Sequence, residues 1–216
     1  MNTAEKFLLL IMHPEKPRYV IPETAINPGL FGAIFVDLSI EGKIEFEDKR
    51  IKAKSSYTKI SKAHDEILRK IAASKKRKKI KSWIAGFAWK SRKYRHMILH
   101  DLAMDGKIRL EDKRFIIFPY KHAYLIDGNY RDSQLKELND IILTGKSLDI
   151  ESASILGIIE ACKMHKVLTK NKESLKIIKS NLKEMVKHDS VSQEVKQVIA
   201  EMQAAAVAAT VVTTSS

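Results

Sequence analysis

The chain has 216 residues, of which 44% are hydrophobic, and this excludes wholesale disorder. Only 8 Gly and 5 Pro occur, which disfavours an all-β or loop-rich fold, and a single cysteine, Cys162, excludes an intramolecular disulfide and a cysteine-based zinc site. The net charge of +13 favours a polyanionic partner, either nucleic acid or an anionic membrane, although a solvated basic surface gives the same composition.

The first part of the chain predicts two helices and a hairpin. Residues 3–12 are expected to form a short helix capped by Thr3. A loop with three prolines follows, and Pro28 marks the start of a second helix that ends at Gly42, because proline suits the first helical position. Residues 43–54 alternate around a polar turn at 47–49, which is typical of a β-hairpin.

The remainder is again mainly helical. Helices are predicted at residues 64–73, 91–104, 132–143, 151–164, 172–187 and 191–208. A second hairpin is predicted from residues 107–110 and 114–118, with Pro119 ending its second strand. We therefore expect a mainly α, compact single domain over residues 1–208, with two surface β-hairpins that follow helices, and a flexible tail at 209–216.

A local duplication links the two hairpins. Residues 37–50 and 101–114 are offset by 64 positions, and nine of their fourteen positions are identical. In each copy a helix ends, a glycine permits the sharp exit (Gly42 or Gly106), and a hairpin follows. The repeating unit is thus a helix followed by a hairpin, present twice.

The chain carries no catalytic motif that we recognise. Gly145, Lys146 and Ser147 resemble the end of a phosphate-binding loop, but the glycine required five positions earlier is Asp140. His96 and His100 have the spacing of two metal ligands on a helix, yet no third ligand is evident. We expect neither an enzyme nor a bound cofactor.

Positive charge gathers in the middle of the chain. Five consecutive basic residues are Lys75, Lys76, Arg77, Lys78 and Lys79. Lys90, Arg92 and Arg95 follow, and the two arginines share a helix face at a spacing of i, i+3. Two guanidinium groups on one face suit a phosphate, while a solvated basic face is the simpler interpretation.

An aromatic and basic segment follows the second predicted hairpin. It comprises Phe118, Pro119, Tyr120 and Lys121, and it continues to Tyr124. Such a mixture is typical of a membrane interface, where amphipathic rings anchor well, and we predict membrane contact here. The alternative is a loop whose aromatic rings pack back on the core. No stretch approaches the roughly 20 apolar residues that cross a bilayer, so any membrane contact is expected to be peripheral.

The order of these elements and several short strings resemble the Golgi phosphoprotein 3 family, and the short N-terminal region resembles its prokaryotic-type members. The strings are residues 5–10, 29–34, 37–44, 65–68, 82–84, 92–95 and 115–119. The resemblance implies a compact helical fold and peripheral binding to the cytoplasmic surface of a membrane through phosphatidylinositol 4-phosphate. It further implies cytosolic tails of membrane proteins as partners, and self-association through a hairpin into a homo-oligomer.

The family's headgroup pocket carries over in part. Its pair of helix-borne arginines matches Arg92 and Arg95, and we add Lys90 as a neighbouring cation. The tryptophan of the family pocket falls at Pro22 and its remaining arginine at Phe31. The resemblance thus predicts an adaptor that binds anionic lipid headgroups with relaxed selectivity.

A different class of function fits the same elements. Helix followed by hairpin, twice, with a net charge of +13, is also what a tandem winged-helix protein that binds nucleic acid presents. The helix predicted at 28–42 is apolar nearly all round, however, which favours burial over a recognition role.

Overall fold

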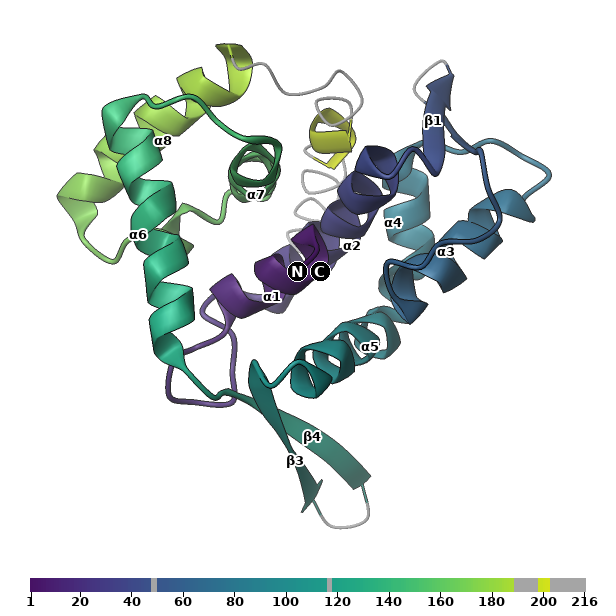
Figure 1. Cartoon of the computed structure of the whole chain (residues 1–216), viewed down its shortest axis with the longest axis horizontal. Coiled ribbons are helices and arrows are strands. Elements are labelled where there is room, and N and C mark those ends of the chain that lie inside the picture. Colours follow the sequence, from purple (N-terminus) through teal and green to yellow (C-terminus); the bar gives the residue numbers. More distant parts are fainter. Residues whose placement is uncertain (48–49, 116–117, 189–197, 203–216) are drawn as a thin grey trace, which may run out of the picture.

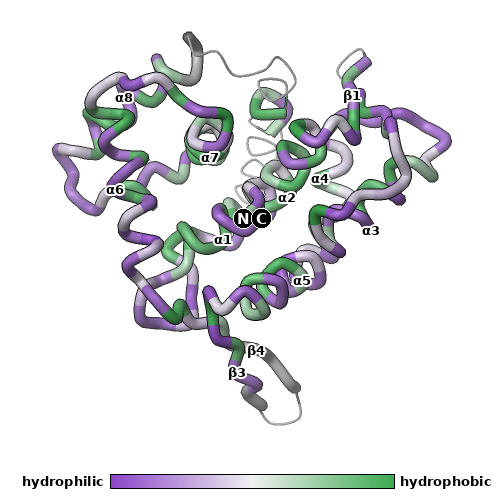
Figure 2. The backbone as a smooth tube through the Cα atoms, in the orientation of Figure 1, coloured by the Kyte–Doolittle hydropathy of each residue, from purple (hydrophilic) through white to green (hydrophobic). Residues whose placement is uncertain are grey.

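A buried helix, α2 (Glu23–Ile40), runs through the middle of the molecule and the other helices surround it (Figure 1). The computed structural model describes residues 1–47, 50–115, 118–188 and 198–202, without the side chains of residues 113–121 and 186–188. Leu30, Ile34, Phe35 and Leu38 of α2 are fully buried. A helix that is apolar on all sides belongs in a core, and hydrophobic residues dominate much of this central region (Figure 2).

Helices lie in two groups on either side of the centre, formed by α1 and α2 (Figure 1). One group contains α3 (Lys62–Ala72), α4 (Ile80–Ala88) and α5 (Ser91–Met104), and the other contains α6 (Gly128–Thr144), α7 (Ile150–Ala161) and α8 (Lys172–His188). A 3₁₀ turn, η1 (His165–Val167), joins α7 to α8. The predicted mainly helical fold is confirmed, and α4 is a helix that was not among the predicted ones.

The starts of the first two helices differ from the prediction. Helix α1 (Thr3–Ile11) is capped by Asn2, whose Oδ1 accepts from the Glu5 N–H at 2.9 Å while the Glu5 carboxylate accepts from the Asn2 N–H. This capping box displaces Thr3 from the cap. Helix α2 begins at Glu23, so Pro28 lies inside the helix and does not start it. Pro22 provides the start, because its carbonyl accepts from the backbone N–H of two residues in the first turn.

Both hairpins are present, and the second is longer than predicted. Strands β1 (Ile44–Glu47) and β2 (Arg50–Ala53) pair as expected. Strands β3 (Ile108–Phe115) and β4 (Phe118–Leu125) pair from end to end, so the turn predicted at residues 111–113 is wrong. The expectation that Pro119 ends a strand is also wrong, since Pro119 pairs with Arg114. Both strands of a two-stranded sheet are edges, where proline is tolerated.

The duplicated exits have the same geometry. Gly42 and Gly106 have φ values of 61° and 66°. In the first copy the Lys43 N–H donates to the Leu38 carbonyl at 2.8 Å, and in the second the Lys107 N–H donates to the Leu102 carbonyl at 2.9 Å. This pattern is the Schellman motif, which requires a left-handed residue and therefore favours glycine.

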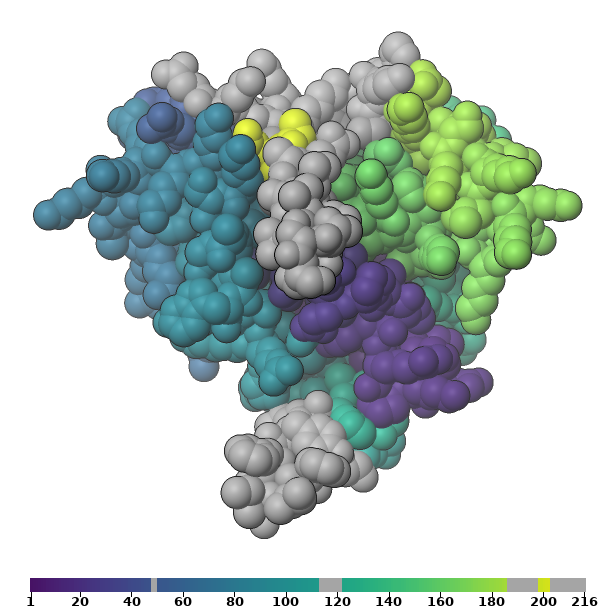
Figure 3. Space-filling model, turned by 180° about the vertical axis from the view of Figure 1, so that it is seen from behind, coloured from purple at the N-terminus to yellow at the C-terminus, as the bar shows by residue number. Residues whose placement is uncertain are grey.

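A short helical turn, residues 198–202, closes the core between the two groups, and Figure 3 shows it in yellow from behind. Met202 is fully buried against Gly32, and Ile199 lies so close to Gly157 that a Cβ on either glycine would overlap its neighbour. Most of the helix predicted at 191–208, and the tail predicted at 209–216, lie outside the described residues. Cys162, the only cysteine of the chain, is buried in the core.

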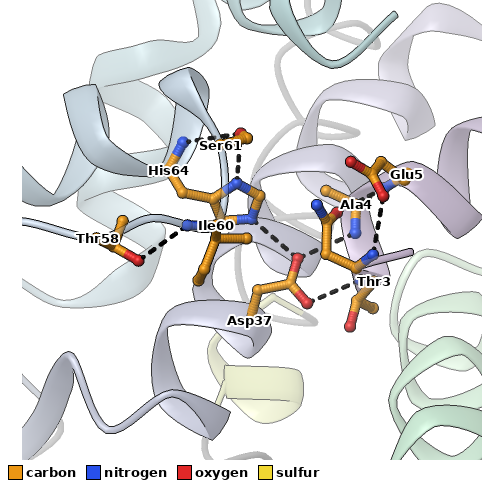
Figure 4. A network of polar contacts seen from close by, with 9 residues as sticks. Thr3, Ala4, Glu5, Asp37, Thr58, Ile60, Ser61 and His64 are labelled. Atoms are coloured by element: carbon orange, nitrogen blue, oxygen red, sulfur yellow. Dashed lines mark hydrogen bonds and ion pairs between the residues drawn. The ribbon is translucent and has the colours of Figure 1, made fainter. Parts of the chain in front are cut away.

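One buried carboxylate joins three helices (Figure 4). Asp37 on α2 accepts from the backbone N–H of Thr3 at 2.8 Å and of Ala4 at 3.1 Å, at the start of α1. The same carboxylate lies 2.9 Å from Nε2 of His64 on α3, and the other ring nitrogen of His64 contacts the Ser61 hydroxyl. The first N–H groups of a helix have no partner within it, and Asp37 supplies the acceptors.

Candidate functional site

An open pocket lies between helix α5, the loop that joins α1 to α2, and the second hairpin. It has a volume of about 610 Å³. Its lining residues are Met12, Pro17, Arg18, Tyr19, Arg92, Arg95, His96, Leu99, Asp112 and Ala123. Three arginines and a histidine thus face one pocket, and Asp112 is the carboxylate among its described lining residues. Its size is in the range that accommodates a small molecule or a headgroup.

Helix α5 contributes four of these side chains. Arg92, Arg95, His96 and Leu99 follow the spacing i, i+3, i+4 and i+7, which places them on one helical face. The opposite face is buried through Tyr94, Ile98 and Leu102. Burial of the apolar face of α5 therefore orients the helix so that its basic face points to the pocket.

Arg95 is held in place by two neighbours. Its Nη1 lies 2.7 Å from Oε1 of Glu23, and its Cζ lies 5.3 Å from the ring centroid of Tyr19. Its side chain is only 12% exposed. Arg95 therefore has a fixed position, and its guanidinium is shared between a partly exposed carboxylate and the pocket that it lines.

Arg92 differs from Arg95 in its surroundings. It is exposed, and it forms no ion pair among the residues that the structure describes. The neighbouring Lys93 is occupied, because its Nζ contacts Glu66 at 2.6 Å. Arg92 is thus the more available of the two helix-borne guanidinium groups.

The loop after α1 brings Arg18 and Tyr19 to the pocket. It closes through an isolated antiparallel bridge between Met12 and Tyr19, and the His13 N–H donates to the Arg18 carbonyl at 2.8 Å. Burial raises the pKa of the Tyr19 phenol, with nearby Arg95 acting in the opposite direction, so Tyr19 is neutral at physiological pH. Sequence reasoning missed both residues, because a loop with several prolines has no periodicity; an Arg-Tyr pair in it was the only signal.

The other predicted basic residues lie apart from the pocket. Lys90 precedes α5 and its Nζ lies 4.2 Å from the ring centroid of Trp89. In the basic run Lys75, Lys76, Arg77 and Lys78 are exposed and Lys79 is half-buried. Arg77 forms an ion pair with Glu47, and Lys78 bridges to Ile51 of β2. Helix α4, about 13 Å long at 1.5 Å per residue, separates this run from α5.

The predicted membrane-contact residues lie in a strand. Phe118, Pro119, Tyr120 and Lys121 form the first half of β4, paired with β3, so the expectation of a loop after the hairpin is wrong. The error follows from the misplaced turn, which made the hairpin too short. The side chains of these four residues lie outside the described part of the structure, and their membrane contact stays a prediction.

The two positions at which the sequence departs from the family pocket have clear structural roles. Phe31 is fully buried, with its ring centroid 5.6 Å from those of Phe87 and Tyr94. Pro22 is the residue before α2, next to Glu23. An aromatic core contact thus stands where the family pattern has an arginine, and Tyr19 provides an aromatic ring beside Arg95.

In the described part of the chain, no group of three or more His, Cys, Asp or Glu side chains is arranged to hold a metal ion. No helix formed by those residues is both long and apolar enough to traverse a bilayer.

The described residues form a mainly helical protein with two antiparallel hairpins and a basic pocket beside one of them. A family model described as Golgi phosphoprotein 3 (GPP34) matches residues 4–202, and the chain therefore belongs to the Golgi phosphoprotein 3 family, a family of non-enzymatic adaptors of membrane trafficking. No curated protein matches the chain at significant similarity. The resemblance inferred from the sequence strings is thus confirmed.

Proposed function

We propose that the protein is a peripheral membrane adaptor that binds the phosphate of an anionic lipid headgroup in the pocket of Arg18, Arg92 and Arg95. The observation that carries this proposal is the convergence of three guanidinium groups on one open pocket. Two of them come from α5 and one from the loop after α1, so the tertiary fold assembles the charge. Guanidinium groups bind phosphate oxygens in a bidentate manner and are the usual choice for such recognition.

Phosphatidylinositol 4-phosphate is the ligand that the family relationship favours. A phosphomonoester carries about −1.5 to −2 charges near neutral pH, which exceeds the charge of a phosphodiester and rewards a site with several cations. Pro22 stands at the position of the family tryptophan, and Tyr19 instead provides an aromatic ring beside Arg95. We propose that charge dominates the binding of the headgroup and that the Tyr19 ring contributes selectivity. The selectivity is weakened because the buried Phe31 stands where the family pocket has an arginine.

The adaptor role implies partners beyond the lipid. We propose that cytosolic tails of membrane proteins bind the assembled protein at the membrane. The hairpins present strand edges that can pair between two copies of the chain, and this supports a homo-oligomer. A measured mass equal to one chain at micromolar concentration would remove the oligomer from the proposal.

Vesicle co-sedimentation tests the lipid proposal. Vesicles of neutral phosphatidylcholine, of phosphatidylcholine with phosphatidylserine, and of phosphatidylcholine with phosphatidylinositol 4-phosphate are compared for wild type and for Arg92→Gln/Arg95→Gln. The matched control is Lys176→Gln/Lys179→Gln, which removes two charges from the exposed face of α8. We expect the pocket variant to lose about tenfold or more in affinity for anionic vesicles, because charge-assisted hydrogen bonds contribute about 1.5–3 kcal/mol each.

The outcomes separate the alternatives. A preference for phosphatidylinositol 4-phosphate that disappears in the pocket variant supports recognition of that headgroup. Equal loss on both anionic vesicles supports charge-driven binding in the same pocket. Equal binding of the pocket variant and the α8 control, or binding to neutral vesicles that resists salt, contradicts the proposal. Tight binding to random duplex DNA without vesicle binding would favour the nucleic-acid function instead.

A further inference from the structure

Trp89 lies at the surface between α4 and α5 with most of its ring in solvent. Its side chain is 77% exposed, whereas Trp83, six residues earlier, is 7% exposed and packs in the core. Trp83 stacks on Phe87 with ring centroids 5.5 Å apart, so the core already has its aromatic cluster on this side. Exposing an indole to water is unfavourable, since burial of a large apolar side chain contributes about 1.5–3 kcal/mol. The fold gains little packing from Trp89, which points to contact with something outside the chain.

The exposed side of α4 leads to Trp89. Lys81, Ser82, Ala85 and Gly86 are the exposed positions of α4, and they lead along the helix to Trp89. A Cβ built on Gly86 meets no atom of the described chain within 4 Å, so the space at this position is open. Trp89 therefore lies at the end of an exposed helix face that a partner can reach.

The charge around Trp89 identifies the partner. The Nζ of Lys90 lies 4.2 Å from the Trp89 ring centroid, and exposed Lys81 and Arg92 stand on either side in the sequence. Indole rings prefer the headgroup region of bilayers, and each nearby Lys or Arg contributes about 1 kcal/mol toward an anionic surface. A cation held against an exposed indole thus matches an anionic lipid surface in both charge and polarity.

Trp89 is close in the sequence to a residue of the candidate headgroup pocket. It precedes α5 by two residues, and Arg92, which lines the pocket, is in the first turn of that helix. The first turn of α5 therefore links the exposed ring to a guanidinium group that lines the pocket.

We propose that Trp89, supported by Lys90, inserts into the headgroup layer of an anionic bilayer and orients the pocket toward it. This inference rests on the proposed function and names the bilayer contact of the same site. It adds a membrane anchor on the α4–α5 junction to the one predicted on β4, so the protein has two separated points of contact.

The chain contains two tryptophans, which makes the test direct. In Trp83→Phe the only indole emission comes from Trp89. We expect this emission to move to shorter wavelength and to be quenched by brominated phosphatidylcholine when vesicles contain phosphatidylserine or phosphatidylinositol 4-phosphate, and to stay unchanged with neutral vesicles. Trp83→Phe could unfold, which a loss of its helical circular dichroism would show. In that case the emission of Trp89→Phe is subtracted from that of wild type, and the difference reports on Trp89. The fold tolerates Trp89→Phe because Trp89 is exposed.

A second pair of variants measures the contribution to binding. Trp89→Ala is expected to lower vesicle affinity about tenfold, because the variant loses the transfer of a large side chain from water into the headgroup layer. Ile177→Ala, on the exposed face of α8, is the control and is expected to leave vesicle affinity unchanged. Soluble glycerophosphoinositol 4-phosphate, which needs the pocket alone, is expected to bind wild type and Trp89→Ala equally.

The possible results distinguish this inference from the proposed function. Sedimentation with anionic vesicles without any change in Trp89 emission overturns the insertion of Trp89 and leaves the pocket function standing. Absence of sedimentation with every vesicle overturns both. Emission changes with single-stranded DNA but not with vesicles overturn the bilayer as partner, because aromatic stacking on bases produces the same signal.

Discussion

Asp37 and His64 are in direct contact in the core, with Nε2 of the histidine 2.9 Å from the carboxylate, although 27 positions separate them in the chain. The carboxylate also accepts from the backbone N–H of Thr3 and Ala4. One side chain therefore fixes how α1, α2 and α3 lie against one another. Because α5 packs on both α1 and α3, this junction also sets the position of the helix that carries the pocket arginines.

We expect Asp37→Ala to lower the free energy of unfolding by about 3 kcal/mol or more, because it leaves two helix N–H groups and a buried imidazole without an acceptor. Urea denaturation followed by circular dichroism measures the loss. Asp101, the equivalent residue of the repeat, is the matched control: burial raises its carboxyl pKa, and its Oδ2 has no hydrogen-bond partner in the described chain. Equal losses of unfolding free energy in Asp37→Ala and Asp101→Ala would show that the hydrogen bonds of Asp37 contribute no extra stability.

The two hairpin exits offer a second comparison. Gly42→Ala and Gly106→Ala are each expected to destabilise the protein by about 1 kcal/mol, because both residues have positive φ. Gly86→Ala is expected to stabilise it by a similar amount, since Gly86 lies inside α4 with open space at its Cβ position. Thermal unfolding of the three variants gives the signs. A gain in stability for either exit variant would contradict the role assigned to left-handed backbone.

These exits also show what the sequence can predict. The repeat placed both glycines correctly, because the helix end and its hydrogen bonds depend on nearby residues. The same repeat misled the prediction of the second hairpin. Glu47 and Arg50 face each other across the first hairpin, whereas the equivalent Glu111 and Arg114 both lie within β3. Identical residues adopt different structures because the residues after them can extend the pairing only in the second copy.

The candidate site was predictable only in the part that one helix carries. Arg92 and Arg95 follow from helical spacing, which is a local property. Arg18 and Tyr19 reach the same pocket through a loop closed by backbone bonds to α1, and such a contact depends on the tertiary fold. The basic run at residues 75–79 was grouped with the arginines by nearness in the sequence, and the length of α4 separates them.

Glu23 is expected to compete with a bound phosphate for Arg95, since its carboxylate lies 2.7 Å from the guanidinium and is 55% exposed. Glu23→Gln should therefore tighten binding to vesicles with phosphatidylinositol 4-phosphate by up to about fivefold, the scale of a partly exposed ion pair. Glu15→Gln, in the exposed loop after α1, makes the same change in net charge and serves as control. Weaker binding of Glu23→Gln would mean that Glu23 positions Arg95 for the ligand.

Stability is expected to depend on pH through Glu160. The hydrogen bond from His165, at 2.6 Å, lowers the pKa of this carboxyl from its ordinary value of 4.5, while burial acts in the opposite direction. A lowered pKa in the folded state means that the stabilisation is present above 4.5 and is lost as the pH falls through the folded-state value. Wild type should therefore exceed Glu160→Gln in stability by more at about pH 6 than at about pH 3.

Urea denaturation at both pH values checks this dependence, with Glu173→Gln in the exposed first turn of α8 as the control. The difference between wild type and the control variant should change little over the same interval. If the stability difference between wild type and Glu160→Gln became larger at acid pH, the pH dependence would have the opposite sign and would contradict a lowered pKa for Glu160.

The two copies of the helix–glycine–hairpin unit share one exit and differ in how far they extend. Strands of four residues in the first hairpin span about 13 Å, and strands of eight residues in the second span about 26 Å, at 3.3 Å per residue. Because the backbone bonds that set the exit lie before the first strand, strand length can change without disturbing the helices. Reach is thus an adjustable dimension of this architecture, and grafting a hairpin of chosen length after Gly42 or Gly106 would vary the span between the body and a distant surface.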